Sequence, residues 1–121
     1  MKSNKTPHFE RLIWKGMPPS NKAREAQLAQ LCEFLGYEGS LESELSEGAN
    51  RQLMLGNLED YDPSWPRADS KSLYVGLFCD KYPHSADLLK SYEENQVTFY
   101  LNEKTDLQNL SEFLSDLLKR N

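Results

Sequence analysis

Residues 52–80 read QLMLGNLEDYDPSWPRADSKSLYVGLFCD and contain two apolar segments joined by a long polar connection. Residues 52–58 hold an apolar run, whereas residues 72–80 alternate in a pattern that puts apolar side chains on both faces. Short segments of this kind predict two β-strands, and the second pattern is typical of a central strand covered on both sides. The connection, residues 59–71, is longer than an ordinary hairpin loop.

The segments on either side predict further strands and helices. A short mixed segment at residues 9–14 indicates a strand, which the glycine and prolines of residues 16–19 end. Residues 20–36 have apolar side chains at spacings of three and four, with Ser20 placed to cap the start of a helix and Gly36 its end. We also expect a short helix over 40–48, a helix over 85–95, a strand over 97–101 and a final amphipathic helix over 105–120, whose start fits a capping box.

The order of these elements predicts the fold class. Its core is β-α-β-β-α-β, the order of the ferredoxin-like α+β fold. We therefore expect an antiparallel four-stranded sheet with helices on one face, an extra short helix and an added C-terminal helix. Residues 1–8 are polar and lack an apolar period, so they are interpreted as a flexible tail before a single α+β domain at residues 9–121.

Charge is distributed unevenly along the chain, whose formal net charge is −5. The first 24 residues carry six bases and one acid, whereas residues 25–62 carry nine acids and one base, Arg51. An acidic body repels polyanions and favours a cationic partner surface. We accordingly expect a protein partner with a basic surface and regard nucleic acid as an unlikely partner.

Few residues are suited to chemistry. The two cysteines, Cys32 and Cys79, are interpreted as reduced, buried side chains, and the only histidines are His8 and His84. No cofactor motif, metal-ligand spacing or catalytic set is apparent, so an enzyme is the less favoured interpretation. No apolar run approaches the length of a bilayer span, and the N-terminus lacks a secretory signal, which predicts a cytoplasmic protein without a membrane partner.

The long connection holds the best candidates for a binding site. Large aromatic residues on a proline-stiffened loop lose little freedom on binding, which makes Tyr61 and Trp65 candidate interface anchors. The alternative is that Trp65 folds back to fill a gap in the core. Acidic residues near the anchors would steer a basic partner, and the full candidate set is Glu42, Glu44, Glu47, Glu59, Asp60, Tyr61, Asp62, Trp65 and Arg67.

These observations favour a small acidic protein-binding module over an enzyme. An inhibitor or an antidote of the immunity type, which covers a basic surface of a toxin, a nuclease or a nucleic-acid-handling complex, would use the acidic residues directly. Two alternatives stay open. One is a ligand-binding or catalytic ferredoxin-like domain, with a pocket lined by Tyr74, Phe78, Cys79 and Tyr100 and with a homodimer formed through the sheet. The other is a weak RNA-binding module.

Overall fold

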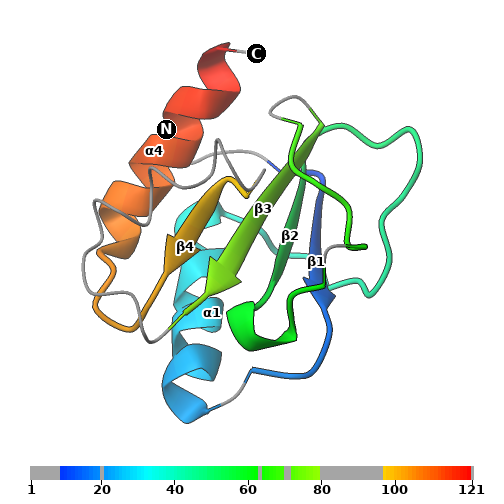
Figure 1. The fold of residues 1–121 in the computed structure, drawn as a ribbon. Helices are drawn as coiled ribbons and strands as arrows, with labels where there is room; N and C mark the ends of the chain where they lie inside the picture. Colours follow the sequence, from blue (N-terminus) through cyan, green and yellow to red (C-terminus); the bar gives the residue numbers. More distant parts are fainter. Residues whose placement is uncertain (1–8, 20, 63, 70–71, 80–96, 121) are drawn as a thin grey trace.

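The computed structural model describes residues 9–19, 21–62, 64–69, 72–79 and 97–120. Four strands and two helices lie in these ranges, together with one turn of 3-10 helix, η1 (Figure 1). In chain order the elements are β1 (Arg11–Lys15), α1 (Lys22–Leu35), β2 (Gln52–Asn57), η1 (Leu58–Asp60), β3 (Leu73–Phe78), β4 (Phe99–Leu101) and α4 (Leu107–Arg120). The expected strands and the first and last helices are therefore present, whereas the helix predicted over 85–95 lies outside the described residues.

All four strands run in the same direction, in the order β1-β2-β3-β4. The predicted antiparallel, ferredoxin-like sheet is therefore wrong. The difference arises between β2 and β3, where Leu53 lies beside Tyr74 in a parallel register. Because β2 and β3 are parallel, the chain has to return along the sheet between Asn57 and Leu73, and such a pair needs a crossover connection of about a dozen residues or more.

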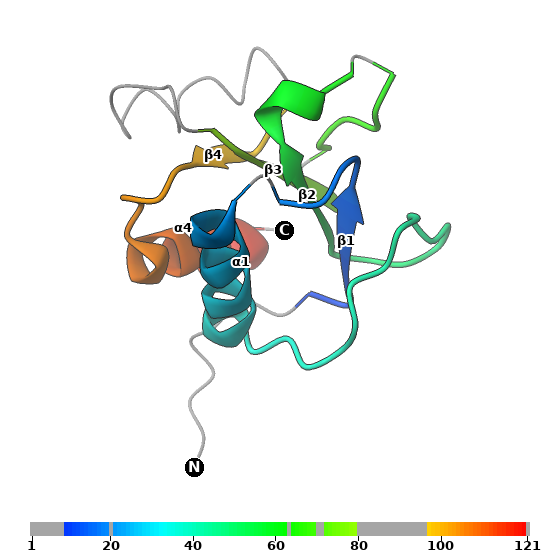
Figure 2. The same ribbon diagram turned by 90° about the horizontal axis from the view of Figure 1, so that it is seen from below.

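Both described helices cover one face of the sheet (Figure 2). Strand side chains alternate between faces, so Leu12 of β1 points toward the helices while its neighbour Ile13 points away. The helix-side core combines apolar residues of α1 and α4 with residues from all four strands; its members include Leu28, Leu31, Leu35, Leu53, Leu55, Tyr74, Phe78, Phe99, Leu110 and Leu114.

The two helices begin at capping residues close to those expected. Asn21 caps α1, because its Oδ1 atom accepts a hydrogen bond from the Arg24 backbone N–H at 2.9 Å. The predicted cap, Ser20, lies outside the described residues. Gly36 ends α1 in the left-handed conformation, as the sequence predicts. At α4 the side chain of Asp106, rather than that of Thr105, accepts from the first-turn N–H groups of Gln108 and Asn109.

Loops cover the opposite face of the sheet. The half-buried side chains of Leu45, Leu58, Tyr61, Trp65 and Ala68 pack there against strand residues that include Ile13, Met54, Val75 and Leu77. We call the described residues of 41–51 and 58–69 the loop layer. This layer does for one face what the helices do for the other, since both faces of a parallel sheet are normally covered.

The predicted helix over residues 40–48 is also wrong. Glu42 instead lies in an extended backbone beside β1, where its carbonyl accepts from the Trp14 N–H and its N–H donates to the Leu12 carbonyl, each at 2.9 Å. Arg11 adds a hydrogen bond from Nη2 to the Glu44 carbonyl at 2.7 Å. A helix as short as residues 40–48 is marginal by itself, and these contacts with the strand edge give the same backbone groups long-range partners.

Gly76 of β3 is required by its close approach to Phe99 of β4. A Cβ atom at Gly76 would lie 2.3 Å from Cζ of Phe99, and both residues are buried. We expect Gly76→Ala to lower the free energy of unfolding by about 1–3 kcal/mol, because overfilling a packed core forces side chains and backbone to shift. Urea denaturation of Gly76→Ala beside Gly39→Ala, where the new methyl would meet only the end of the Tyr37 side chain, measures the effect. Equal denaturation midpoints for the two variants would contradict this packing.

Candidate protein-binding surface

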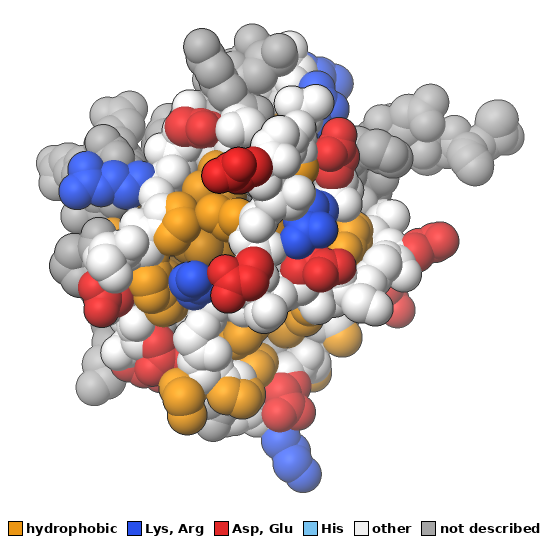
Figure 3. All heavy atoms as spheres, turned by 90° about the vertical axis from the view of Figure 1, so that its right-hand side faces the viewer, with side chains coloured by type: hydrophobic (Ala, Val, Ile, Leu, Met, Phe, Trp, Pro, Cys, Tyr) orange, Lys and Arg blue, Asp and Glu red, His pale blue; other side chains and the backbone are white. Residues whose placement is uncertain are grey.

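Negative charge is concentrated in the loop layer. Its residues include two arginines, Arg51 and Arg67, and seven acids, Glu42, Glu44, Glu47, Glu59, Asp60, Asp62 and Asp69. Each of the helices α1 and α4 carries two acids and two bases, so the helix side is balanced. Figure 3 shows a face on which acidic side chains surround hydrophobic atoms and outnumber basic ones. Among the described residues, the loop layer therefore holds most of the excess of acidic over basic side chains.

Three of the predicted residues lie along the segment beside β1. Glu42, Glu44 and Glu47 are all exposed. The Glu42 carboxylate lies 3.8 Å from Nη2 of Arg11, an ion pair that water screens because both side chains are partly exposed. Glu44 contacts Arg11 only through its backbone carbonyl in the bonds described above. These carboxylates are therefore displayed to solvent by a segment whose backbone is fixed to the sheet edge.

Glu59 and Asp60 belong to a polar cluster at the carboxyl end of β2. At its centre is Asn57, which is 1% exposed. Asn57 Oδ1 accepts from Arg24 Nη1 at 2.7 Å, and Asn57 Nδ2 donates to Asp60 Oδ2 at 3.0 Å. The same amide donates to the carbonyls of Met17 and Pro18 at 3.2 and 3.0 Å. One buried amide thus links the turn after β1, the start of α1 and η1.

Arg24 supplies a buried positive charge to this cluster. Its side chain is 3% exposed, and Nη1 also donates to Glu59 Oε2 at 3.1 Å. Glu59 itself is 55% exposed, so its carboxylate joins the buried guanidinium to the surface. Glu59 and Asp60 therefore have structural partners as well as places on the predicted surface.

Tyr61 and Trp65 form an aromatic pair on the loop layer. Their ring centroids are 5.6 Å apart at an interplanar angle of 71°, the edge-to-face arrangement that aromatic pairs favour. A Cβ atom at Gly56 would lie 3.0 Å from Cζ3 of Trp65, so the indole lies directly on the β2 backbone. Both rings are half-buried. Trp65 therefore fills part of the core, as the alternative interpretation required, and still presents part of its surface.

Asp62 and Arg67 complete the predicted set, and both are exposed. Asp62 Oδ1 accepts from the Ser64 backbone N–H at 2.8 Å. Hydrogen bonds from Ser64, the backbone one first, lower the pKa of the Asp62 carboxyl below its usual value. Asp62 consequently stays negatively charged at neutral and mildly acidic pH. The structure thus brings Glu59, Asp60, Tyr61, Asp62 and Trp65 together on one loop, with Glu42, Glu44 and Glu47 on the neighbouring segment.

Three residues of this region were not predicted from the sequence. Met17 is 65% exposed on the turn after β1, whereas Arg24 and Asn57 are buried, and Asn57 Nδ2 donates to the Met17 carbonyl. A signal existed for Arg24, because it lies four residues before Leu28 and so occupies the next position of the apolar stripe on α1. Met17 and Asn57 gave no local signal, since their importance depends on contacts between distant segments.

In the part of the chain that the structure describes, the four residues expected to line a small-molecule pocket do not face one common cavity. Tyr74, Phe78, Cys79 and Tyr100 are all buried, and Tyr74 and Phe78 lie on the helix side while Tyr100 lies on the other. Two surface clefts lie near α4 among the described residues. One of about 390 Å³ separates α1 from the start of α4 and includes Gln27 and Phe34. The other, of about 240 Å³, lies between Tyr100 and Phe113. Tyr100 is the one residue of the expected pocket that lines either cleft, and neither cleft includes a residue of the predicted protein-binding set.

Cys32 and Cys79 both have free thiols, and they differ in burial. Cys79 is buried, and Cys32 is half-buried against the helix-side core, where desolvation raises the pKa of its thiol and so disfavours the reactive thiolate. His8 and His84 lie outside the described residues. Among the described ranges, no three His, Cys, Asp or Glu side chains gather as metal ligands would, and neither helix combines the length and apolar character of a membrane span.

Comparisons with known proteins add no relative to this description. No family model matches the chain, and neither the curated proteins nor the solved structures include a significant match.

The buried amide of Asn57 is expected to stabilise the whole corner of the fold. Replacing it by alanine in Asn57→Ala leaves the Arg24 guanidinium and two carbonyls without this partner, which should lower the free energy of unfolding by about 2–4 kcal/mol. Thermal and urea denaturation of Asn57→Ala beside the exposed Asn50→Ala measures the difference. The prediction is wrong if both variants unfold at the midpoint of the unmodified chain.

Proposed function

We propose that this chain is a non-enzymatic protein-binding module that docks a basic protein surface through its loop layer. The observation that carries the proposal is the contrast between the two sides of the sheet: seven acids and two bases in the loop layer, against two acids and two bases in each described helix. Net acidity alone would serve solubility, but solubility does not require the acids to gather on one side.

The charges would act mainly on the rate and specificity of association. Exposed carboxylates are individually weak contributors to affinity, because water and salt screen them. Together they attract a cationic surface over several ångströms and raise the encounter rate, while they repel anionic competitors such as nucleic acid. The half-buried Tyr61–Trp65 pair would supply the desolvated contact that holds the complex once formed.

The partner class follows from this chemistry. Proteins that bind nucleic acid or cleave it need a cationic cleft, and an acidic surface can cover such a cleft in place of the polyanion. An inhibitor or antidote of a toxin, a nuclease or a nucleic-acid-handling complex is the specific role that we propose for this module.

Two triple variants of equal net charge test the proposal. The loop-layer variant neutralises three exposed acids of the loops and is Glu44→Gln/Glu47→Gln/Asp62→Asn. The helix variant neutralises three exposed acids of α1 and α4 and is Glu25→Gln/Glu33→Gln/Glu112→Gln. Each changes the formal charge from −5 to −2. Proteins captured from the native host by the immobilised chain are identified by mass spectrometry, purified and measured by surface plasmon resonance at low and high salt.

For a specific partner we expect a basic surface and an association rate that falls roughly tenfold between about 0.05 M and 0.5 M salt. The loop-layer variant should associate roughly threefold to tenfold more slowly, whereas the helix variant keeps most of the rate. Equal effects of the two variants, or an association rate independent of salt, would refute docking through the loop layer. Preferential binding of single-stranded RNA in the same assay would replace the proposal with the RNA-binding alternative.

A further inference from the structure

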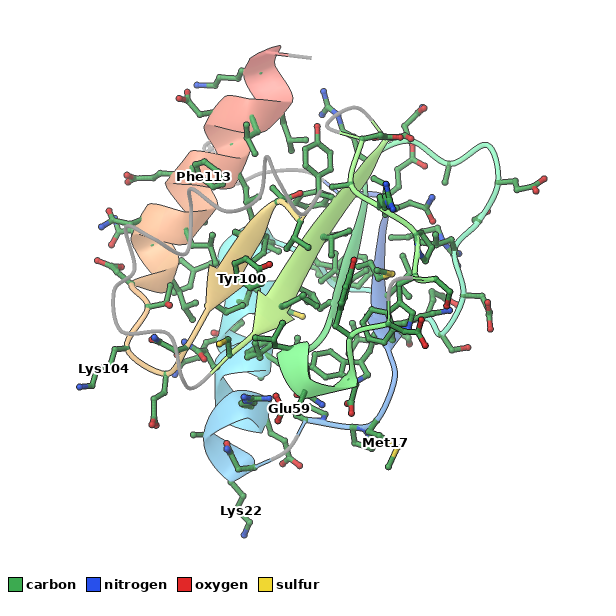
Figure 4. All side chains as sticks on the ribbon, in the orientation of Figure 1. Met17, Lys22, Glu59, Tyr100, Lys104 and Phe113 are labelled. Carbon is green, nitrogen blue, oxygen red and sulfur yellow. The ribbon has the colours of Figure 1, made fainter. Side chains whose placement is uncertain are left out.

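We infer that the docking surface has an apolar anchor at Met17, and that the segment it accepts is an amphipathic basic one, in which lysine or arginine alternates with leucine-like side chains. This inference rests on the proposed function and specifies the partner's chemistry. We call the group Met17, Asp60, Tyr61 and Trp65 the Met17 corner. It lies where the turn after β1 meets the loop after η1 (Figure 4).

Met17 is the most exposed large apolar side chain among the described residues, at 65%. Figure 4 shows it extending away from the ribbon beyond the end of β1. Its backbone is nevertheless held firmly, because its carbonyl accepts from Trp14 Nε1 at 2.6 Å and from Asn57 Nδ2 at 3.2 Å. The turn therefore presents an apolar side chain to water on a fixed backbone, and a preorganised contact loses little freedom on binding.

The rest of the corner packs around Gly16, which has a φ of +86°. A Cβ atom at Gly16 would lie 3.2 Å from Cζ2 of Trp65 and 3.3 Å from Cβ of Asp60. The indole, the Asp60 side chain and the turn that carries Met17 consequently meet at one point. Tyr61 adjoins this point through its edge-to-face contact with Trp65.

The composition of the corner determines what can cover it. A purely cationic surface would pair with Asp60 of the corner and with the adjacent Glu59 and Asp62, but it would leave Met17 in water. A purely apolar surface would bury Met17 but desolvate those carboxylates without partners, which is costly. A segment that presents apolar and basic groups side by side satisfies both requirements, and the unbranched, polarisable methionine side chain adapts to the shape of its apolar groups.

The other exposed apolar residues do not share this setting. Phe34, 37% exposed, lies on α1, whose charges balance. Leu41, 40% exposed, belongs to the loop layer but lies on the segment beside β1. Phe34 therefore offers a matched control for Met17, since it is an exposed apolar side chain on the opposite side of the sheet.

Two synthetic peptides of equal charge provide the test. Both are 14-residue peptides with lysine at the same positions, and the remaining positions are leucine in one and serine in the other. Fluorescence anisotropy of each labelled peptide, titrated with the full chain at low salt, gives its affinity. We expect the leucine peptide to bind roughly tenfold or more tightly than the serine peptide. The substitution Met17→Ser should reduce this ratio of affinities by a factor of roughly three to ten. Phe34→Ser should leave the preference unchanged.

The outcomes separate this inference from the proposal on which it rests. If both peptides bind in a salt-dependent way but Met17→Ser has no more effect than Phe34→Ser, the anchor is overturned while docking of a basic surface survives. If neither peptide binds at low salt, both fail. A leucine preference that high salt does not weaken would also overturn the inference, because the carboxylates would then take no part. Urea denaturation of the two variants verifies that each remains folded.

Discussion

The common direction of the four strands is the constraint on which the rest of the structure depends. In a parallel sheet all strands end on the same side, so a chain that completes one strand must return to the opposite side before the next strand can begin. Between β1 and β2 a helix and the segment beside β1 make this return, but between β2 and β3 a single turn of 3-10 helix and a loop make it. The loop therefore has to cover a sheet face that a helix would otherwise cover. The large side chain of Trp65 covers part of this face.

A second consequence concerns the carboxyl ends of the strands, where the turn after β1, the start of α1 and η1 meet. Backbone groups in such turns need partners that no strand ladder provides. Asn57 supplies them from the end of β2, and Arg24 brings a guanidinium from α1 to the same amide. A buried arginine is costly unless it is well hydrogen-bonded, so the position of Glu59 at the surface of this cluster has a structural reason beside its place in the docking surface.

The sequence predicts the positions of the strands and the outer helices well, because apolar periodicity and capping residues are local signals. It does not predict strand direction, since the period of a strand is the same in both directions. Two features of residues 52–80 did indicate a parallel pair: apolar side chains on both faces of residues 72–80 and a connection too long for a hairpin.

The helix predicted over 40–48 failed for a related reason, because the backbone of Glu42 bonds to a strand edge far away in the chain. Among site residues, Tyr61 and Trp65 stand out by composition, whereas Met17 is an ordinary residue until the turn that carries it is seen to be held by Trp14 and Asn57.

The Trp65 side chain belongs both to the core and to the surface. Trp65 can lie on the sheet because Gly56 and Gly16 leave room for its ring, and at Gly16 the ring meets both Asp60 and the turn that carries Met17. A larger residue at either glycine would displace the indole and with it the geometry of the corner, even though neither glycine offers a side chain to a partner. Binding and stability are consequently coupled at this corner. A substitution that loosens the packing of Trp65 also disturbs the fixed arrangement of the exposed Met17 and its neighbouring carboxylates, and the proposed recognition surface depends on that arrangement.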